Sequence, residues 1–244
     1  TILSVTGDDE AADSLQMLMD QWGIHAFFKR DPAIKTTVKL RVVARNQQLI
    51  RLDFEDTPCH EVLAAIKTDY RQMLPNYDVV ILADYGKGGL THVAEMSEWA
   101  REAGKPVLVD PKGDDYEKDA GATLLTPNRA EFKEVAGSWK SEEELTNKAQ
   151  ALRRHLHLEA LLLTRSEEGM SLYRVGELHH QPTHAQEVFD VSGAGDTVIG
   201  CMGVGLAAGY SLPEAMYLAN TAAGVVVAKV GTAVCSFEEL VSEL

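Results

Sequence analysis

A small-residue turn near the C-terminal end of the chain places a carboxylate where an anion could bind. Residues 189–200 read F-D-V-S-G-A-G-D-T-V-I-G, with two aspartates six residues apart. Gly193, Ala194 and Gly195 directly precede a long apolar stretch that is typical of a buried helix. Glycines there let the backbone approach a ligand, and the unpaired N–H groups at a helix start attract anions. The stretch therefore predicts an anion site with Asp196 in the first helical turn beside it.

Phosphoryl transfer is the chemistry that uses both features of this turn. Backbone N–H groups can stabilise charge on the moving phosphoryl group, and a carboxylate can accept the proton of the attacking hydroxyl. The alternative is that Asp196 is a helix-start carboxylate that only interacts with the helix dipole. The spacing alone does not decide between the two. The Gly-Lys-Ser/Thr of a Walker A loop does not occur in the sequence, which argues against a P-loop nucleotidase.

Composition and charge exclude several classes of protein. The 244 residues are 45% hydrophobic and carry a net charge of -14. We find no basic face, which argues against a nucleic-acid partner, and any phosphate site must be built locally. The sequence has no apolar run long enough to span a membrane, and its first residues lack the layout of a signal peptide. The three cysteines form no C-x-x-C pair and fit a reducing, cytoplasmic location.

The elements that must position this turn alternate between strand and helix. Four short apolar runs have the character of strands buried on both faces of a parallel sheet. They are residues 78–83, 106–111, 123–127 and 160–164. Amphipathic helices are expected between them, at residues 93–102, 130–136 and 141–155. This alternation predicts an α/β architecture with right-handed crossovers.

Two hairpins and a helical C-terminal part complete the expected fold. Residues 36–44 and 48–55 alternate apolar and polar side chains, as do 169–175 and 177–182, and each pair predicts an antiparallel hairpin. Helices are expected at residues 196–208, 212–229 and 236–244. Capping boxes are expected at Ser141 with Glu144 and at Ser236 with Glu239. Since no repeat or linker interrupts the chain, we expect one domain over residues 1–244.

Several segments together resemble one family. D-V-S-G-A-G-D-T closely resembles the C-terminal signature of the ribokinase-like (PfkB) carbohydrate kinases. Four further segments agree with the family in order and spacing: D-P-K at 110–112, T-P-N-R-A-E at 126–131, T-R-S-E-E-G at 164–169 and A-N-T-A-A-G at 219–224. More narrowly, residues 39–55 and 182–190 resemble the kinase module of the bifunctional heptose kinase/ADP-heptose synthase. The resemblance covers essentially the whole chain.

This resemblance implies a ribokinase-like fold with a mostly parallel central sheet, flanking helices and a partial antiparallel lid hairpin. It implies ATP-dependent phosphorylation of D-glycero-β-D-manno-heptose 7-phosphate at its anomeric hydroxyl, giving the 1,7-bisphosphate, for ADP-heptose and lipopolysaccharide core synthesis. The alternatives are another sugar or nucleoside substrate on the same scaffold, or a non-catalytic nucleotide-binding fragment. The family's first strand, half of its lid and much of its sugar-binding wall do not precede Thr1, and the H-x-G-H motif of the synthase is not found.

The resemblance also assigns residues to the nucleotide side. It makes Asp196 the catalytic base and gives the amides of Gly193, Ala194 and Gly195 the task of stabilising the transferred phosphoryl group. Glu131 is expected to bind Mg²⁺ through water. The expected nucleotide-binding residues are Lys112, Asn128, Arg129, Ala130, Glu131, Thr164, Ser166, Gly169, Asn220 and Gly224. For Asn128 with Glu131 the alternative is a helix cap, for Lys112 a solvated surface lysine, and for Gly224 close helix packing.

Basic residues are expected on the sugar side. Asp84 and Lys87 follow a predicted strand, and Lys39, Arg41, Arg45 and Arg51 lie on the first hairpin. Basic residues on a lid suit a substrate with its own phosphate, although a solvated hairpin face is the alternative. Asp190 is a candidate for a monovalent-cation site, as in some relatives. The expected cofactors are ATP and Mg²⁺, with K⁺ if Asp190 has that role. The expected partners are the sugar phosphate and a second copy of the chain, with no nucleic acid and no membrane.

Overall fold

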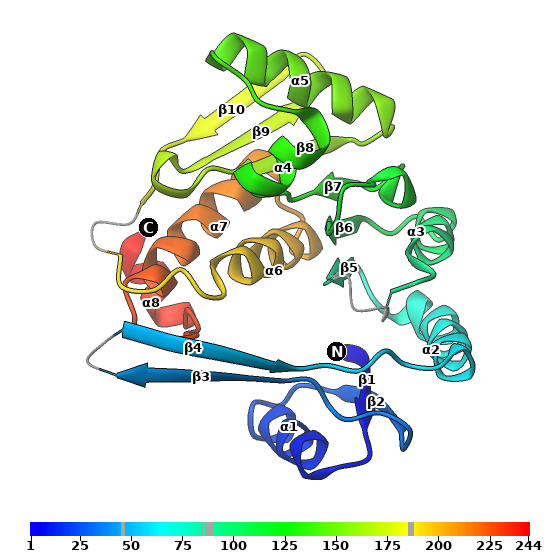
Figure 1. The fold of residues 1–244 in the computed structure, drawn as a ribbon. Coiled ribbons are helices and arrows are strands. Elements are labelled where there is room, and N and C mark those ends of the chain that lie inside the picture. Colours follow the sequence, from blue (N-terminus) through cyan, green and yellow to red (C-terminus); the bar gives the residue numbers. More distant parts are fainter. Residues whose placement is uncertain (45–46, 84, 86–89, 185–187) are drawn as a thin grey trace. The chain divides into compact units, whose positions relative to one another are not determined.

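The structure is a computed structural model that describes residues 1–44, 47–83, 85, 90–184 and 188–244 (Figure 1). Its internal contacts divide the chain into two compact units. The N-terminal unit comprises Thr1–Leu74 and Tyr85–His92, and the core unit comprises Pro75–Asp84 and Val93–Leu244. The single-domain organisation over residues 1–244 stays a prediction.

The core unit is built on a six-stranded sheet with the order β10-β9-β8-β7-β6-β5. The strands are β5 (Val80–Ala83), β6 (Val107–Asp110), β7 (Leu124–Leu125), β8 (Ala160–Thr164), β9 (Met170–Arg174) and β10 (Glu177–Gln181). Strands β5 to β8 pair in parallel, whereas β9 pairs antiparallel with β8 and β10. The four predicted parallel strands and the second predicted hairpin are therefore confirmed.

Burial along the strands follows their place in the sheet. The apolar residues of β6, β7 and β8 are buried on both faces, as their continuous apolar sequence predicts. Strand β5 differs, because its residues alternate between buried and exposed and Ile81 keeps 39% of its surface accessible. In the described sheet β5 has only β6 as a neighbour, so its outer side is a sheet edge.

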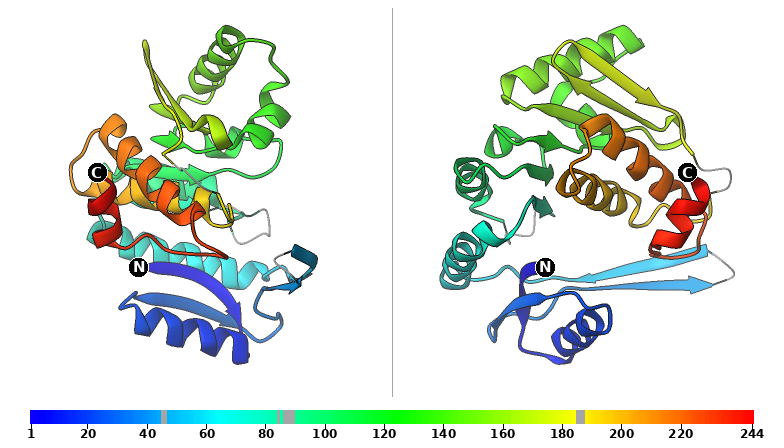
Figure 2. Two further views of the ribbon diagram at one scale, coloured as in Figure 1. Left: turned by 90° about the vertical axis from the view of Figure 1, so that its left-hand side faces the viewer. Right: turned by 180° about the vertical axis from the view of Figure 1, so that it is seen from behind.

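Helices cover both faces of this sheet. Figures 1 and 2 show α6 (Ala194–Ala207) and α7 (Leu212–Val227) together on one face, and α3 (Val93–Glu102) and α5 (Glu142–His155) on the other. The main core lies between the sheet and α6 with α7, where residues such as Leu162 are fully buried. The shorter helices of this unit are α4 (Arg129–Ala136), α8 (Phe237–Glu243), η2 (Glu117–Asp119) and η3 (Ser166–Glu168), while η1 (Leu74–Asn76) lies at the junction of the units.

Helix caps agree with the sequence to different degrees. Ser236 and Glu239 form the predicted capping box of α8. At α5, Ser141 Oγ accepts a hydrogen bond from the Glu144 N–H at 3.1 Å. The Glu144 carboxylate, however, accepts from the N–H of Lys140, one residue before the cap, at 2.8 Å. The predicted reciprocal bond is therefore displaced by one residue, although both groups still satisfy a donor at the helix start.

The N-terminal unit contains two strands and two helices for which the sequence patterns give no clear signal. Strands β1 (Ile2–Gly7) and β2 (Ala26–Asp31) pair in parallel and are joined by α1 (Glu10–Gln21), and α2 (His60–Met73) follows later in the chain. Asp9 caps α1 by accepting a hydrogen bond from Ala12 N at 3.0 Å. Its carboxylate also accepts from Thr36 N and Thr36 Oγ1, which ties the helix start to the segment before the hairpin.

The predicted first hairpin is present and has two chemically different faces. Strands β3 (Val38–Ala44) and β4 (Gln47–Phe54) pair antiparallel, with an irregularity between Val42 and Val43. Apolar residues face each other across the strands on one side, as in the pair Leu40 and Leu52. Charged residues occupy alternate positions up to the irregularity, with Lys39 opposite Asp53 and Arg41 directly opposite Arg51. Among the residues that the structure describes, no helix is both long and apolar enough to cross a membrane.

Candidate functional site

Helix α6 begins two residues earlier than the sequence predicts, at Ala194. Gly193 is its N-cap and has φ +83°, a left-handed conformation that disfavours every residue with a Cβ atom. The Thr197 N–H and the Thr197 hydroxyl both donate to the Gly193 carbonyl at 2.9 Å. Asp196 lies in the first turn and is exposed, so its carboxylate is accessible for chemistry at this helix start.

The backbone at this helix start is open to a ligand on one side. A Cβ atom built on Gly195 would have no atom within 4 Å apart from its chain neighbours and the backbone of its own helix. The N–H groups of Gly195 and Asp196 lie in the first turn, where an α-helix offers no intrahelical acceptor. Ala194 differs, because its N–H donates to the Val191 carbonyl at 3.2 Å. The first-turn amides after Ala194 are therefore the better candidates for holding an anion.

Lys112 connects two of the predicted site residues electrostatically. It follows β6, and its ammonium forms an ion pair with the Glu131 carboxylate. Partial burial of the ammonium group lowers the pKa of Lys112. The hydrogen bond to Glu131 and the negative charges of Glu131, Asp110 and Asp196 have a larger, opposite effect, so the pKa of Lys112 is raised overall. Lys112 therefore remains a cation at neutral pH, and the negative charges of Glu131 and Asp196 both act on it.

Asn128 and Glu131 form the capping box of α4. The Asn128 side chain accepts from the N–H groups of Ala130 and Glu131 at 2.9 and 3.1 Å, and the Glu131 carboxylate accepts from the Asn128 N–H at 2.9 Å. The helix-cap alternative is thus correct in the structure. It does not exclude a ligand role, because the same helix start borders a hollow of about 430 Å³. The hollow is lined by Asn128, Ala130, Glu131, Lys133 and Glu134.

The side-chain oxygens at the start of α4 fit a magnesium ion whose ligands are mainly water and phosphate. Each Glu131 oxygen accepts one hydrogen bond from the protein, and an ionised carboxylate has further lone pairs to accept from metal-bound water. The described residues contain no cluster of three or more His, Cys, Asp or Glu side chains arranged to hold a metal. Mg²⁺ usually keeps several waters and binds through few carboxylates plus substrate phosphates, so the residues fit that mode.

The predicted nucleotide loop lies next to the α4 start. Thr164 ends β8, forms a parallel bridge to Asn128 and donates its N–H to the Pro127 carbonyl at 3.1 Å. The following turn is closed by the Arg165 N–H, which donates to the Gly169 carbonyl at 2.8 Å. Ser166 has φ +55° and Gly169 has φ +84°. Two motifs that are far apart in the sequence are thereby brought together at the carboxyl ends of β7 and β8.

The remaining nucleotide-side residues belong to the segments around α7. Asn220 is buried in α7, and its Nδ2 donates to the Pro182 carbonyl at 2.8 Å. Gly224 is buried in the same helix, as close packing requires. Asp190 Oδ1 accepts from the Ser192 N–H at 2.8 Å, and the Asp190 N–H donates to the Val227 carbonyl at 3.3 Å. These bonds connect the approach to α6 with the end of α7.

The candidate sugar-side residues that the structure describes lie in the N-terminal unit. The Lys39 ammonium is 3.9 Å from a Glu55 carboxylate oxygen and 5.6 Å from the ring centroid of Tyr85. Arg51 is paired with Asp53 at 2.9 Å. Arg41 is exposed. Three further candidates, Arg45, Asp84 and Lys87, lie outside the described residues.

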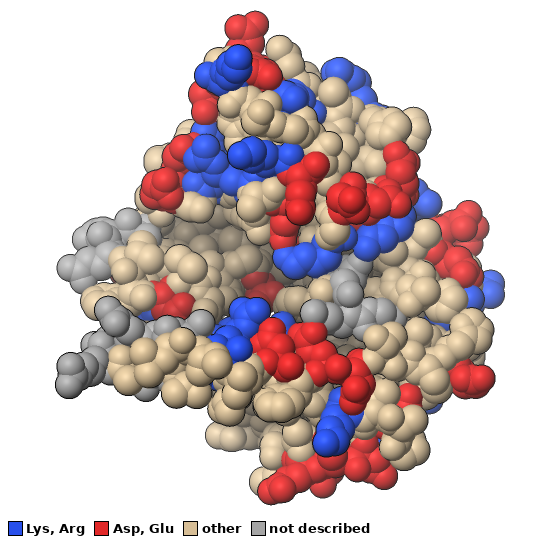
Figure 3. All heavy atoms as spheres, viewed as in Figure 1, with Lys and Arg blue, Asp and Glu red and all other residues tan. Residues whose placement is uncertain are grey.

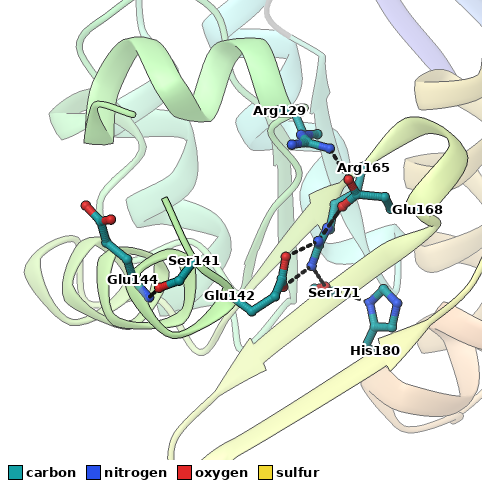
Figure 4. Close-up of polar contacts among 8 residues, drawn as sticks. All are labelled: Arg129, Ser141, Glu142, Glu144, Arg165, Glu168, Ser171 and His180. Atoms are coloured by element: carbon teal, nitrogen blue, oxygen red, sulfur yellow. Dashed lines mark hydrogen bonds and ion pairs between the residues drawn. The ribbon is translucent and has the colours of Figure 1, made fainter. Parts of the chain in front are cut away.

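A buried arginine at the nucleotide loop was not identified from the sequence. Arg165 lies within T-R-S-E-E-G, and its guanidinium contacts Glu142, Glu168 and Ser171 (Figure 4). A charged residue directly after the buried strand β8 was the available signal. Elsewhere, Lys and Arg side chains are interspersed with Asp and Glu on the face that Figure 3 shows, which fits a locally built anion site on an acidic chain.

Comparison with known proteins identifies clear relatives. The profile of the pfkB family carbohydrate kinase matches residues 1–239. The proteins named "Bifunctional protein HldE" of Chromohalobacter salexigens and Aeromonas hydrophila are 51% and 54% identical over the whole chain. The chain spans about half the length of these curated relatives, 51% in each case.

The fold has close counterparts among solved structures. The Arabidopsis thaliana ribokinase structure, described as complexed with ribose and ATP, superposes with a TM-score of 0.82 at 19% identity. The match covers 99% of this chain and 80% of the ribokinase chain. The predicted ribokinase-like architecture is confirmed by this match.

Proposed function

The chain belongs to the pfkB family of carbohydrate kinases, and we propose that it transfers the γ-phosphoryl group of ATP to a sugar hydroxyl. In this proposal the Asp196 carboxylate accepts the hydroxyl proton while the hydroxyl oxygen forms a bond to the γ-phosphorus. The bond between that phosphorus and the β–γ bridging oxygen breaks, and ADP leaves. The position of Asp196, exposed in the first turn of α6 behind Gly193 and Gly195, is the observation that carries the proposal.

The residues around Asp196 have complementary roles in this reaction. The first-turn N–H groups of α6 stabilise negative charge on the transferred group. The Lys112 cation, whose pKa is raised, contributes positive charge for the phosphates. Glu131 and Asn128 hold magnesium-bound water, and the metal ion, when bound, neutralises phosphate charge. The loop from Thr164 to Gly169 and the α7 residues Asn220 and Gly224 bind the rest of the nucleotide.

The proposed acceptor is D-glycero-β-D-manno-heptose 7-phosphate, phosphorylated at its anomeric hydroxyl. Relatives named "Bifunctional protein HldE" at 51–54% identity support this choice, together with the resemblance of residues 39–55 to the heptose kinase module. The charged face of the hairpin adds a physical argument. Arg41 and Arg51 stand directly opposite each other, and Asp53, which pairs with Arg51, supplies one negative charge against these two positive charges. A phosphate group bound there would balance the remaining positive charge.

Further properties stay predictions. They are homodimer formation, a cytoplasmic location, and a monovalent-cation site at Asp190.

The decisive assay measures ADP release by the protein in its natural length, with the heptose phosphate as acceptor. Asp196→Asn keeps the shape of the side chain but removes the base, so we expect kcat to fall by about 10²–10⁴-fold. Glu143→Gln is the matched control, because Glu143 is also an exposed carboxylate in the first turn of a helix in the core unit. If Asp196 only interacts with the helix dipole, both variants will keep nearly full turnover.

A panel of acceptors tests the substrate. Heptose 7-phosphate should give the highest kcat/KM among phosphorylated and unphosphorylated sugars, and Arg41→Gln should raise its KM. A neutral sugar that is used better than the heptose phosphate would refute the basic-hairpin argument and favour another pfkB-type sugar kinase. ATP binding without turnover on any sugar would favour a non-catalytic nucleotide-binding role.

A further inference from the structure

Arg165 is a buried cation whose guanidinium nitrogens all donate hydrogen bonds to protein side chains. Its side chain keeps only 7% of its surface accessible, although arginine is seldom buried unless it is paired. It follows the last residue of β8 directly and precedes η3. The residue thus stands where the sheet ends and the proposed nucleotide loop begins.

The guanidinium group is held on three sides (Figure 4). Its two terminal nitrogens donate to the two carboxylate oxygens of Glu142, at 2.8 and 2.7 Å. Nε donates to Glu168 at 2.9 Å, and Nη2 also contacts this carboxylate. Nη1 donates to Ser171 Oγ at 3.2 Å. Such a planar, multidentate arrangement needs the fork geometry of arginine, which a lysine ammonium does not have.

The contacts continue from Arg165 to the start of α4. The second oxygen of Glu168 accepts from Arg129, the first residue of that helix. The Arg129 guanidinium lies 5.7 Å from the ring centroid of Trp139, within the range of a cation–π contact. Glu168 therefore bridges a cation fixed at the end of β8 and a cation fixed at the start of α4.

The cluster joins two parts of the proposed nucleotide site that come from different strands. The loop from Ser166 to Gly169 follows β8, while Asn128 and Glu131 follow β7. The loop contains a non-glycine residue, Ser166, with φ +55°, a conformation that needs support from its surroundings. The hydrogen bonds of Arg165 to Glu168 supply that support from inside the loop itself.

We propose that Arg165 is a positioning residue of the nucleotide site: through Glu168 and Arg129 it holds the loop 166–169 and the start of α4 in one fixed arrangement. This rests on the proposed function. Arg165 touches no substrate in this account. Fixing geometry explains the cluster better than net stability does. Only Arg165 is buried, the side chains of Glu142 and Glu168 are 70% and 38% exposed, and ion pairs with solvent-exposed partners contribute little net stability. The Arg165 hydrogen bonds also lower the pKa of both Glu142 and Glu168, so both carboxylates keep their charge to a lower pH than an ordinary glutamate.

The test separates ATP binding from stability. Arg165→Lys keeps the charge but loses the fork, and we expect the KM for ATP and its calorimetric Kd with Mg²⁺ to rise about 10- to 100-fold, as for a small misplacement of binding groups. The KM for the sugar should change less than about twofold. Arg153→Lys is the matched control, because Arg153 is equally buried in the core unit and bonds to Gln150 and the Leu158 carbonyl, away from the loop.

Two outcomes would overturn the proposal. One is ATP affinity in Arg165→Lys that equals that of the wild type. The other is an equal loss of ATP affinity in Arg153→Lys at a matched decrease in melting temperature, which would indicate a purely structural role. If the wild type itself binds no ATP, the proposed function fails first and this inference fails with it.

A double-mutant cycle gives an independent readout that does not depend on folding of the arginine variant. Glu168→Gln removes the charge of the bridging residue, and Arg129→Met removes one of its two partners. Their effects on the Kd for ATP should therefore be strongly non-additive. We expect the double variant to bind ATP about as weakly as the worse single variant. Fully additive effects would show that Glu168 does not couple the loop to α4, and would refute the proposed route.

Discussion

Gly169 offers the sharpest structural test of the nucleotide loop. It closes the turn after β8 with φ +84° and ψ −127°. A Cβ atom at this position would lie 2.0 Å from the Gln181 carbonyl oxygen and 2.6 Å from backbone atoms of Pro182 and Thr183. Because the obstructing atoms belong to the backbone, Gly169→Ala cannot be accommodated by a side-chain rotation.

The expected cost has two parts. The backbone conformation costs about 1–2 kcal/mol for a residue with a Cβ atom. The overlap must then be relieved by moving the backbone from Gln181 to Thr183, which we expect to add about 1–3 kcal/mol, as for overpacking in a core. Gly176→Ala is the matched control, since Gly176 has φ +71° in the neighbouring turn but a Cβ atom there meets nothing within 4 Å. It should lose only the first part.

Thermal and urea unfolding of both variants measure this difference. At about 2–4 °C per kcal/mol, Gly169→Ala should melt about 4–20 °C below the wild type and Gly176→Ala about 2–8 °C below it. Because Asn220 donates to the Pro182 carbonyl, displacement of that segment should also weaken ATP binding in Gly169→Ala alone. Equal losses of stability in the two variants would show that the close approach to Gln181 is not present in the protein.

Two further predictions follow from the ion pair at Arg165 and from the α4 cap. The Arg165 hydrogen bond lowers the pKa of Glu142 from its ordinary value of 4.5. The ion pair therefore contributes its full stability above about pH 4.5, and this contribution is lost as the pH falls through the lowered pKa of the folded state. The melting-temperature difference between the wild type and Glu142→Gln should therefore narrow from about pH 6 to about pH 3, and a constant difference would contradict the assignment. Asn128→Ala and Ser236→Ala each remove a capping side chain, and each should lower the free energy of unfolding by about 1 kcal/mol. Only Asn128→Ala should also raise the KM for Mg-ATP. A KM that is unchanged in both would leave Asn128 as a helix cap only.

The sequence patterns predicted the core unit well because its signals are local. The apolar run at β8 is fully buried on both faces, and the glycine at 193 has the positive φ that its place before a helix suggests. The strands and helices of the N-terminal unit were harder to predict from the sequence. Helix α2 begins at His60, and its N-cap residue Cys59 makes no side-chain capping hydrogen bond, so the usual Ser, Thr, Asp or Asn signal of a helix start is missing there. Few residues of β1 and β2 are fully buried, since each strand combines exposed, half-buried and buried positions, and their pattern is weak.

The Arg165 cluster could not be predicted for a different reason. Glu142 is the first residue of α5 and Glu168 the last residue of the short helix η3, and nothing in their local sequence distinguishes them from other glutamates of the chain. Their shared partner appears only when the start of α5 is packed against the end of β8. Similarly, the ion pair of Lys112 with Glu131 depends on the neighbouring positions of β6 and β7 in the sheet. Side-chain pairs between elements follow from tertiary packing, which local patterns do not contain.

The central claim is that the γ-phosphate of ATP rests at the start of α6 beside Asp196. A crystal structure of the protein with a non-hydrolysable ATP analogue, Mg²⁺ and the sugar phosphate tests it most directly. We predict the γ-phosphate at the Gly195 N–H and the acceptor hydroxyl within hydrogen-bond distance of the Asp196 carboxylate. A triphosphate bound elsewhere, with Asp196 facing only solvent, would contradict the account.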